Sequence, residues 1–379
     1  LNAIRRKKNK KRRILFGFPL MTQVYFLIPG LLLPEAARPF LSAETLAVAG
    51  RITRAAAGDA VTQVLTAGPA AASVHLAWLW RVLTRKPLPF ASAPYAWLMD
   101  QGPELSGEIW RMHFAHDDGT ALTDLDGRIT NDAAESLAQL LRAPLDQAGF
   151  VLQRWDQTFY LTRKTDWGVE AAAWPALRAG VINRDCALAA RSDAAPDALP
   201  KAQETVRTIN SLLAGVRITT DGTQVNFTWI DGGGHGGRFY PPTKIRSVLT
   251  DEPAVLGWAQ EAGILNHRTG KAKDAETWPG DAPPGECIAV LEDLYEPWLT
   301  RDWKTWSEKL PALVTHIETL AAASRIKNCD QALVVACGMT HTVSVPVRLP
   351  GAAARALSLL ERLRGNSGLT AEAWLFEPD

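Results

Sequence analysis

The residues with the clearest chemical potential lie between Gln224 and Pro242, where an apolar strand-like run leads into a segment with five glycines in six positions. A backbone without side chains lets a polar or charged ligand approach closely. Asp231, His235 and Arg238 would surround such a ligand. The chemistry suggested by these residue types is the binding of a phosphate or another polar group.

This glycine segment does not match the known phosphate-binding loops. No Gly-Lys-Ser/Thr follows it, and its glycine spacing is not G-x-G-x-x-G. Two interpretations remain: a loop that binds a ligand, and a flexible connector that Phe239 to Pro242 pin in place. The candidate ligand-binding residues of the segment are Asp231, Gly232, Gly233, Gly234, His235 and Arg238.

Two pairs of polar residues follow other apolar runs. Glu292 and Asp293 come directly after one run, and Thr340 and His341 follow another. The acidic pair could bind a metal or act as acid and base, although such residues often are solvated or cap the next element. Ligand sites of parallel sheets lie at the carboxyl ends of the strands. We therefore predict that both pairs and the glycine segment converge at one sheet edge.

The remaining histidines and cysteines form no recognisable metal site. His113 and His116 lie in a run that alternates like a strand, so they face opposite ways and a metal pair is not expected. His316 lies among apolar residues at helical spacing and is interpreted as a satisfied histidine. No Ser/His/Asp elbow, H-E-x-x-H or EF-hand pattern occurs. Without a C-x-x-C pair, the cysteines are predicted to be reduced and structural, in a cytosolic protein; they are Cys186, Cys287, Cys329 and Cys337.

Composition and charge narrow the class of protein. The chain has 379 residues and 47% hydrophobic content, enough for one large or two medium domains with proper cores. Eight of its 41 basic residues lie between Arg5 and Arg13. The rest of the chain is mildly acidic, which argues against broad nucleic-acid binding. The basic head at residues 1–20 is interpreted as a tail for nucleic acid or anionic lipid, as part of a membrane signal, or as sequence upstream of a start at Met21.

An uncharged stretch follows the basic head. Residues 14–34 are long enough to cross a bilayer and follow the basic run in a positive-inside arrangement. Prolines, glycines, Thr22 and Gln23 interrupt the stretch, and a buried parallel strand over 23–30 that ends in a Pro-Gly turn explains it equally well. We expect the strand and a cytoplasmic location, with a membrane anchor as the alternative.

The hydrophobic pattern predicts alternating strands and helices. After the first strand, residues 41–84 are predicted to be mostly helical. Residues 105–185 look like a small α-β-β subdomain, whose helix is capped by Asn131 or Asp132 and is kinked or divided by Pro144. Further strands and helices follow in alternation, which indicates an α/β fold with a largely parallel sheet. The later predicted elements are a helix around 202–213, a hairpin at Asp221-Gly222, strands at 287–291 and 332–337, a helix over 303–320 and a closing helix over 353–360.

The order of these motifs resembles archaeal-type cofactor-independent phosphoglycerate mutases. The Asp-Gly-Arg-Ile-Thr core at Asp126 to Thr130 and its following helix are similar to part of the inserted domain of that family. Gln224 to Gly234 and Pro253 to Gly263 are similar to a strand, glycine turn and helix in its second half. The match is closer to bacterial RpfE-type regulatory proteins, often labelled phosphoglycerate-mutase-like. It rests there on Val225 to Ile230 with Gly232 to Gly234, and on Val290 to Leu294 with Trp306.

The resemblance implies an alkaline-phosphatase-like fold. It divides the chain into the basic head at 1–20, a first part at 21–104, the inserted α/β subdomain at 105–185, and a second part at 195–379. True mutases carry an aspartate for metal at the end of the first strand, where this chain has Ile28-Pro29-Gly30. They carry an Asp-His pair after a late strand, where this chain has Cys337-Gly338. The loss of two ligand clusters leaves no inherited site for a metal pair.

Three functional hypotheses follow. The first is a catalytically degenerate, regulatory or ligand-binding protein without a cofactor, whose partner is a small molecule or a protein. The second is an active phosphoryl-transfer enzyme, of mutase or phosphatase type, that holds Mn or Mg with Asp231, Glu292, Asp293 and His341. The third is a membrane-tethered protein anchored by residues 14–34.

Overall fold

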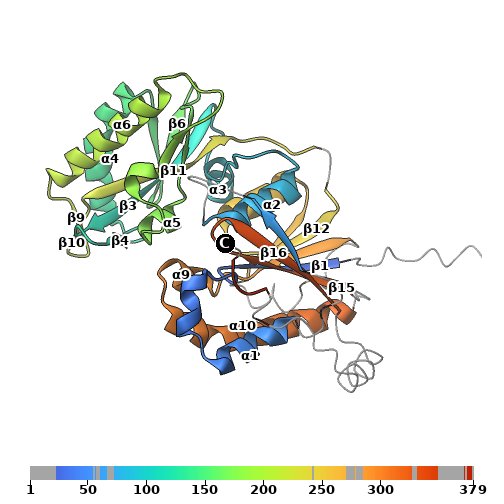
Figure 1. Cartoon of the computed structure of the whole chain (residues 1–379). Helices are drawn as coiled ribbons and strands as arrows, with labels where there is room; N and C mark the ends of the chain where they lie inside the picture. Colours follow the sequence, from blue (N-terminus) through green and yellow to red (C-terminus); the bar gives the residue numbers. More distant parts are fainter. Residues whose placement is uncertain are drawn as a thin grey trace, which may run out of the picture.

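The chain forms two units, each built on its own β-sheet (Figure 1). The computed structural model describes residues 23–53, 56, 60–65, 72–240, 243–269, 278, 285–326, 331–348, 371 and 374–377. The basic head and the predicted closing helix at 353–360 lie outside these residues. Within the described residues, the predicted α/β architecture with a mostly parallel sheet flanked by helices is confirmed.

The larger sheet has seven strands in the order β13-β12-β14-β1-β15-β16-β2. Its first five strands are parallel, and β16 and β2 are antiparallel additions at one edge. The central strand β1 is buried on both faces, which explains its continuous apolar sequence. The strands are β1 (Gln23–Pro29), β2 (Val61–Val64), β12 (Ile245–Leu249), β13 (Leu265–His267), β14 (Glu286–Val290), β15 (Gln331–Cys337) and β16 (His341–Arg348).

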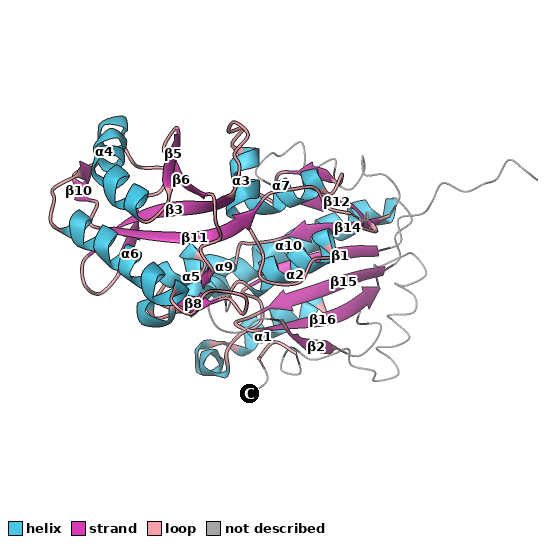
Figure 2. Cartoon of the chain, turned by 90° about the horizontal axis from the view of Figure 1, so that it is seen from above, coloured by secondary structure: helices cyan, strands magenta, loops and turns pink. Residues whose placement is uncertain are grey.

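Helices cover both faces of the larger sheet. Phe26 and Ile28 of β1 face a core with α1, α9 and α10, whereas Leu27 faces a core with α2 and α7. Figure 2 shows these layers from above. The segment 41–84 is less helical than predicted, because β2 interrupts it. The helices are η1 (Glu35–Phe40), α1 (Ala43–Ile52), α2 (Val74–Thr84), α3 (Ala93–Met99), α7 (Pro253–Glu261), α9 (Tyr295–Leu299) and α10 (Trp303–Ile326).

The smaller sheet has five strands, with the order β11-β3-β6-β5 and β4 paired to β3. Helices α4 and α6 pack on one face of this sheet and share a core with Trp110, Met112 and Phe114 of β3. Helix α3 lies against the opposite face and also touches α7, so it connects the two units. The elements are β3 (Glu108–Asp117), β4 (Leu122–Asp124), α4 (Asn131–Gln147), β5 (Val151–Trp155), β6 (Thr158–Arg163), β7 (Val169–Ala171), α5 (Trp174–Arg178), η3 (Arg184–Cys186), β8 (Leu188–Ala190), α6 (Ala198–Ala214), β9 (Thr219–Thr220), β10 (Thr223–Gln224) and β11 (Phe227–His235).

This smaller unit is larger than the subdomain predicted at 105–185. Helix α6 and strand β11 belong to its core and sheet, so it continues to His235. The second part of the larger unit therefore begins near β12 and not at residue 195. The prediction failed because β11 pairs with a strand more than one hundred residues earlier, and local periodicity carries no information about such a partner.

Helix α4 corrects a second prediction. Its N-cap is Thr130, whose hydroxyl accepts a hydrogen bond from the amide of Ala133, and not Asn131 or Asp132. Pro144 lies inside a continuous helix, three positions from its last residue.

The cap supports a stability prediction. Thr130→Ala is expected to lower the free energy of unfolding by about 1 kcal/mol, because an amide of the first turn loses its acceptor. Asn131→Ala serves as the matched control, with an effect below about 0.5 kcal/mol. Urea unfolding followed by circular dichroism measures both. Equal effects of the two substitutions would contradict the assignment of Thr130 as the cap.

The uncharged stretch at 14–34 is only partly described. Residues 23–29 form the central strand β1, and Leu31, Leu32 and Leu33 are buried in the core next to it. This arrangement contradicts an anchor that uses residues 23–33. Among the described residues, the helices are all too short or too polar to cross a bilayer.

Candidate functional site

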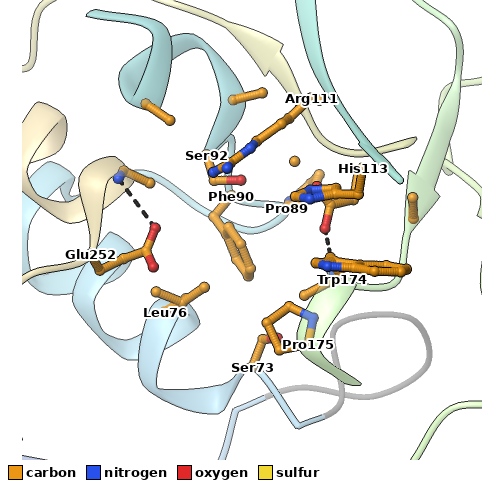
Figure 3. Close-up of a pocket in the computed structure, with 18 of the residues that line it drawn as sticks. Ser73, Leu76, Pro89, Phe90, Ser92, Arg111, His113, Trp174, Pro175 and Glu252 are labelled. Atoms are coloured by element: carbon orange, nitrogen blue, oxygen red, sulfur yellow. Dashed lines mark hydrogen bonds and ion pairs between the residues drawn. The ribbon is translucent and has the colours of Figure 1, made fainter. Parts of the chain in front are cut away.

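A cavity of about 610 Å³ lies between the two units (Figure 3). The larger unit lines it with residues of α2, the start of α7 and the segment before α9. The smaller unit lines it with residues of β3, β11 and α5. Its ionisable lining residues include Arg111, His113, Asp126, Asp231, Glu252 and Glu292.

The alternation of β3 places two of these side chains. Trp110, Met112 and Phe114 point into the core of the smaller unit, so Arg111 and His113 point to the other side of the sheet, where the cavity lies. The predicted opposite orientation of His113 and His116 agrees with this pattern. The antiparallel register brings Asp231 of β11 opposite Arg111. Strand pairing thus assembles part of the site from residues distant in sequence.

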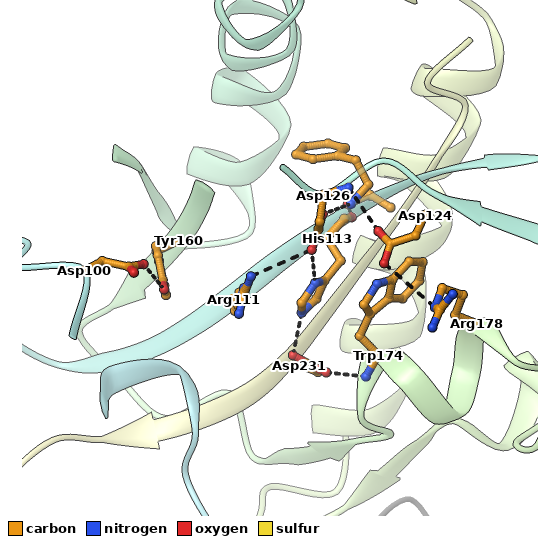
Figure 4. A network of polar contacts seen from close by, with 11 residues as sticks. Asp100, Arg111, His113, Asp124, Asp126, Tyr160, Trp174, Arg178 and Asp231 are labelled. Carbon is orange, nitrogen blue, oxygen red and sulfur yellow. Dashed lines mark hydrogen bonds and ion pairs between the residues drawn. The ribbon is translucent and has the colours of Figure 1, made fainter. Parts of the chain in front are cut away.

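His113 is held between two carboxylates (Figure 4). Its Nδ1 lies 2.5 Å from Oδ2 of Asp126, and its Nε2 lies 3.0 Å from Oδ1 of Asp231. The second oxygen of Asp231 accepts a hydrogen bond from the backbone amide of Trp174 at 2.5 Å. The indole of Trp174 stacks on the imidazole, with 5.3 Å between ring centroids and 12° between planes. The two carboxylates and the indole therefore fix the position and the orientation of the His113 imidazole.

The two carboxylates also control the charge of His113. Burial disfavours the imidazolium, but the negative charges of Asp231 and Asp126 outweigh it and raise the pKa of His113 to about 9. Burial also acts against the carboxylate of Asp126, whose pKa is nevertheless lowered by the neighbouring His113 charge. At neutral pH, His113 is thus a cation that donates both of its N–H groups. It has no free nitrogen with which to accept a proton from a ligand.

Arg111 is a cation of the cavity lining whose hydrogen-bond donors are not all used by described residues. Its guanidinium comes no closer than 3.9 Å to Asp126, and its Nε is buried without a hydrogen-bond partner among the described residues. The Nε1 of Trp174, a residue that is 4% exposed, also lacks an acceptor there. Both residues line the cavity. A ligand oxygen is the natural acceptor for these donors, because unpaired buried N–H groups are costly.

Two acidic side chains line another part of the cavity. Glu252 caps α7 by accepting a hydrogen bond from the amide of Ala254, and burial raises its pKa. Burial, together with the nearby charges of Glu252, Asp251 and Asp293, raises the pKa of Glu292 to about 8. At neutral pH, Glu292 therefore is mostly a neutral carboxylic acid.

The predicted convergence of site residues is only partly correct. Asp231, Gly232 and Gly233 share the cavity with Glu292. The glycine segment reaches it from the smaller sheet, and not from the carboxyl edge of the larger one as predicted. Thr340 and His341 lie outside the cavity lining, where His341 bonds to Thr340 and approaches Glu377.

The other predicted residues do not line the cavity. His235 is exposed and pairs with Asp166 at 2.7 Å, while Gly234 lies one position before it in β11. Arg238 and Asp293 are exposed and do not line the cavity.

The glycine segment is mostly a strand, and neither of its two predicted forms describes it. Gly232 to Gly234 belong to β11, with an irregularity in its register against β3. A side chain at Gly233 would meet the indole of Trp110 at 2.1 Å, and the carbonyl of Gly232 accepts a hydrogen bond from the amide of Ser92. Close packing between β11, β3 and α3 thus explains the small residues, while Gly232 and Gly233 also form part of the cavity wall.

The residues present do not fit a two-metal site of the mutase type. Pro29 and Cys337 are register partners at the ends of β1 and β15. The two strand ends at which the mutases are expected to carry metal ligands therefore lie side by side in this chain. Cys337 is buried, and burial raises the pKa of its thiol. Among the described residues, no group of three or more His, Cys, Asp or Glu could hold a metal ion. The alternative set Asp231, Glu292, Asp293 and His341 is not brought together.

Sequence reasoning missed most of the cavity. Arg111 and Trp174 were given no role, and Asp126 was considered only as the first residue of the Asp-Gly-Arg-Ile-Thr core. His113 was considered only as half of a metal pair. The alternation of β3 contained a usable signal, because it places a charged and an ionisable residue opposite three large apolar ones.

Comparisons with known proteins concern the fold. No family model and no curated protein matches the chain. The solved structures that resemble it include the cofactor-independent phosphoglycerate mutase from Thermoplasma acidophilum, at 10% identity and a TM-score of 0.38 over 86% of this chain and 90% of that one. The PH0037 protein from Pyrococcus horikoshii matches at 14% identity and a TM-score of 0.46, over 88% and 89% of the two chains. At these scores the similarity assigns no function.

Proposed function

We propose that this chain is a catalytically degenerate, phosphoglycerate-mutase-like protein of the RpfE-type whose role is to bind a small molecule in the cavity between its two units. Such a protein would regulate its target according to whether the ligand is bound, and it would not convert the ligand into a product. The proposal treats Arg111 as the residue that binds an anionic oxygen group of the ligand. It leaves the regulated process unassigned.

The observation that carries this proposal is the Arg111 guanidinium. Arg111 and His113 supply two positive charges next to the carboxylates of Asp126 and Asp231, so this cluster is balanced in charge. Among the described residues, the Arg111 Nε and the Trp174 Nε1 still lack acceptors. A carboxylate or phosphate can accept from the flat guanidinium with two oxygens at once, which favours such a group over a neutral one.

The lining of the cavity also supports binding over metal-dependent chemistry. His113 has both nitrogens occupied, so it cannot serve as a general base without losing a carboxylate partner. The strand ends that resemble the metal positions of the mutases carry Pro29 and Cys337 instead of carboxylate and imidazole pairs. Both observations favour a site that recognises a ligand over one that turns it over.

The test is titration of the purified chain with inorganic phosphate and with small carboxylates, followed by calorimetry. Arg111→Met is expected to weaken binding by about tenfold, since it removes charge-assisted hydrogen bonds. Arg142→Met is the matched control, because Arg142 is exposed on α4, and it should leave the affinity unchanged. Equal affinities of the wild type and Arg111→Met would refute the role of Arg111. Near-stoichiometric bound metal together with mutase or phosphatase turnover would establish the enzyme alternative.

A further inference from the structure

The part of the cavity away from Arg111 has a different chemical character. Figure 3 shows Arg111 and Ser92 on one side, and Ser73 and Pro175 on the opposite side. The hydroxyl of Ser73 is fully buried, and no hydrogen bond of regular geometry joins it to a described residue.

Burial raises the pKa of Tyr295, and an interaction with the neighbouring Ser73 hydroxyl opposes this rise. The Tyr295 hydroxyl itself donates to the carbonyl of Ala72 at 2.8 Å. The Ser73 hydroxyl is a further polar group of the cavity lining without a regular hydrogen-bond partner among the described residues, and it comes from the segment before α2, apart from Arg111 on β3.

Among the described residues, no cation lies within ion-pair distance of Glu252 or Glu292, and the charges of Arg111 and His113 act on Glu252 only from further away. Neither Glu252 nor Glu292 forms an ion pair with another described residue, and the Glu292 carboxyl makes no hydrogen bond there either. By contrast, Asp126 and Asp231 share His113, and Asp124 lies beside Arg178. His75 does not provide the missing charge, because burial lowers its pKa to about 3 and keeps it neutral.

We propose that the ligand is amphoteric, with an anionic oxygen group at Arg111 and a protonated amine that binds Glu252, Glu292 and Ser73. This inference deepens the proposed function and rests on it. An ammonium group carries three donors and one positive charge. The two carboxyls and the Ser73 hydroxyl offer the matching acceptors and the countercharge. A hydroxyl at the same end of a ligand would satisfy Ser73 but would leave the acids without a cation.

The proposal predicts that binding releases a proton. The groups that face Glu292 are Glu252 and Asp251 from the start of α7, Asp293 and Tyr295 from the region of α9, and neutral His75 from α2. Near pH 7 Glu292 is mostly protonated, because its pKa is about 8. The ammonium of the ligand favours the ionised form of Glu292. The affinity for the ligand therefore rises with pH up to about pH 8 and then levels off.

The experiment uses the full chain and two series of probes, ω-amino carboxylates from glycine to aminohexanoate and the corresponding ω-aminoalkyl phosphates. Each probe is compared with the analogue that lacks the amine. The best amine-bearing probe is expected to bind at least about tenfold more tightly than its analogue, as for a hydrogen bond to a charged group. Calorimetry at pH 7 in two buffers of different ionisation enthalpy measures the released proton.

Glu292→Gln separates this inference from a general effect on the cavity. The variant is expected to reduce the affinity for the amine-bearing probe to that for its analogue and to abolish proton release. Glu44→Gln makes the same chemical change at an exposed position of α1 and should alter neither the amine preference nor the proton release.

The outcomes distinguish the two proposals. Equal binding of the amine-bearing and amine-free probes, with Arg111 still required, would overturn the amphoteric ligand and leave the proposed function standing. An amine preference that survives in Glu292→Gln would also overturn it, since the amine would then bind elsewhere. Binding that does not depend on Arg111 in either series would refute the proposed function, and the inference would fall with it.

Discussion

Replacing His113 with alanine is expected to lower the free energy of unfolding by about 3 kcal/mol, the cost of breaking a buried ion pair by removing one partner. Asp231 is 7% exposed, and one of its oxygens has the His113 Nε2 as its bonding partner. Asp126 would retain only the distant Arg111 at 3.9 Å and the amide of Phe114. Two carboxylates would then be buried with little compensation.

The matched control lies on the same strand. His116 points to the opposite side of β3 and contacts the carbonyl of Gln224, without a carboxylate partner. His116→Ala is expected to cost less than about 1 kcal/mol, as for an ordinary hydrogen bond. Urea unfolding at pH 7 measures both variants. A loss in His113→Ala no larger than in His116→Ala would show that the carboxylates do not depend on the imidazole.

The same residue gives stability a dependence on pH. The pKa of His113 is about 9 in the folded chain and 6.5 in the unfolded one, so its contribution is on the order of 3 kcal/mol. Because the folded pKa is the higher, this stabilisation is fully present below about pH 6.5 and is lost as the pH rises through about 9. Glu292, whose pKa is raised to about 8, also lowers the stability of both the wild type and His113→Ala as the pH rises to about 8. The difference between the unfolding midpoints of the wild type and His113→Ala, measured from pH 6 to pH 10, is therefore the quantity that should shrink as His113 loses its proton.

Gly257→Ala is expected to destabilise the larger unit by about 2 kcal/mol. Gly257 lies inside α7, where helix α3 crosses closely. A Cβ at this position would meet the carbonyl oxygen of Tyr95 at 2.4 Å and the Cβ of Tyr95 at 2.7 Å. A backbone atom cannot move aside as a flexible side chain can, so the two helices must separate.

Gly50→Ala is the control for this prediction. Gly50 also lies inside a helix, α1, but no atom within 4 Å would meet a Cβ at that position. Alanine is the better helix former, so Gly50→Ala should raise stability by up to about 1 kcal/mol. Thermal unfolding should therefore move in opposite directions for the two variants. A stabilising effect of both would show that the contact between α3 and α7 can relax.

Local sequence signals predicted the elements well but not their partners. The buried strands β1, β14 and β15 are visible as apolar runs because parallel strands are covered on both faces. The helices α4 and α6 are visible because their apolar residues recur at helical spacing. The pairing of β11 with β3 cannot be predicted from the sequence, because any strand of suitable alternation could pair with β3.

The site was harder to predict than the fold for the same reason. His113 was placed on the correct face of its strand, but its partners are 13 and 118 residues away. Glu292 could be singled out by its position after β14, whereas its raised pKa depends on acids from α7. Arg111 looks like an ordinary surface residue of an alternating strand until α3, α5 and α7 close around it. The chemistry arises from the contact between the two units, which no single motif encodes.

The position of β1 in its sheet has a consequence for how the chain is made. The Tyr25 hydroxyl donates a hydrogen bond to Glu286, 261 positions later, and both neighbours of β1 come from the last third of the chain. A ribosome that adds about 5 to 20 residues per second needs roughly 10 to 50 seconds to reach β14. The smaller unit is complete by His235 and can fold in the meantime. During that interval β1 is an unpaired apolar strand, the kind of segment that aggregates readily. The central strand of the larger sheet thus needs protection during synthesis until its two neighbours have been made.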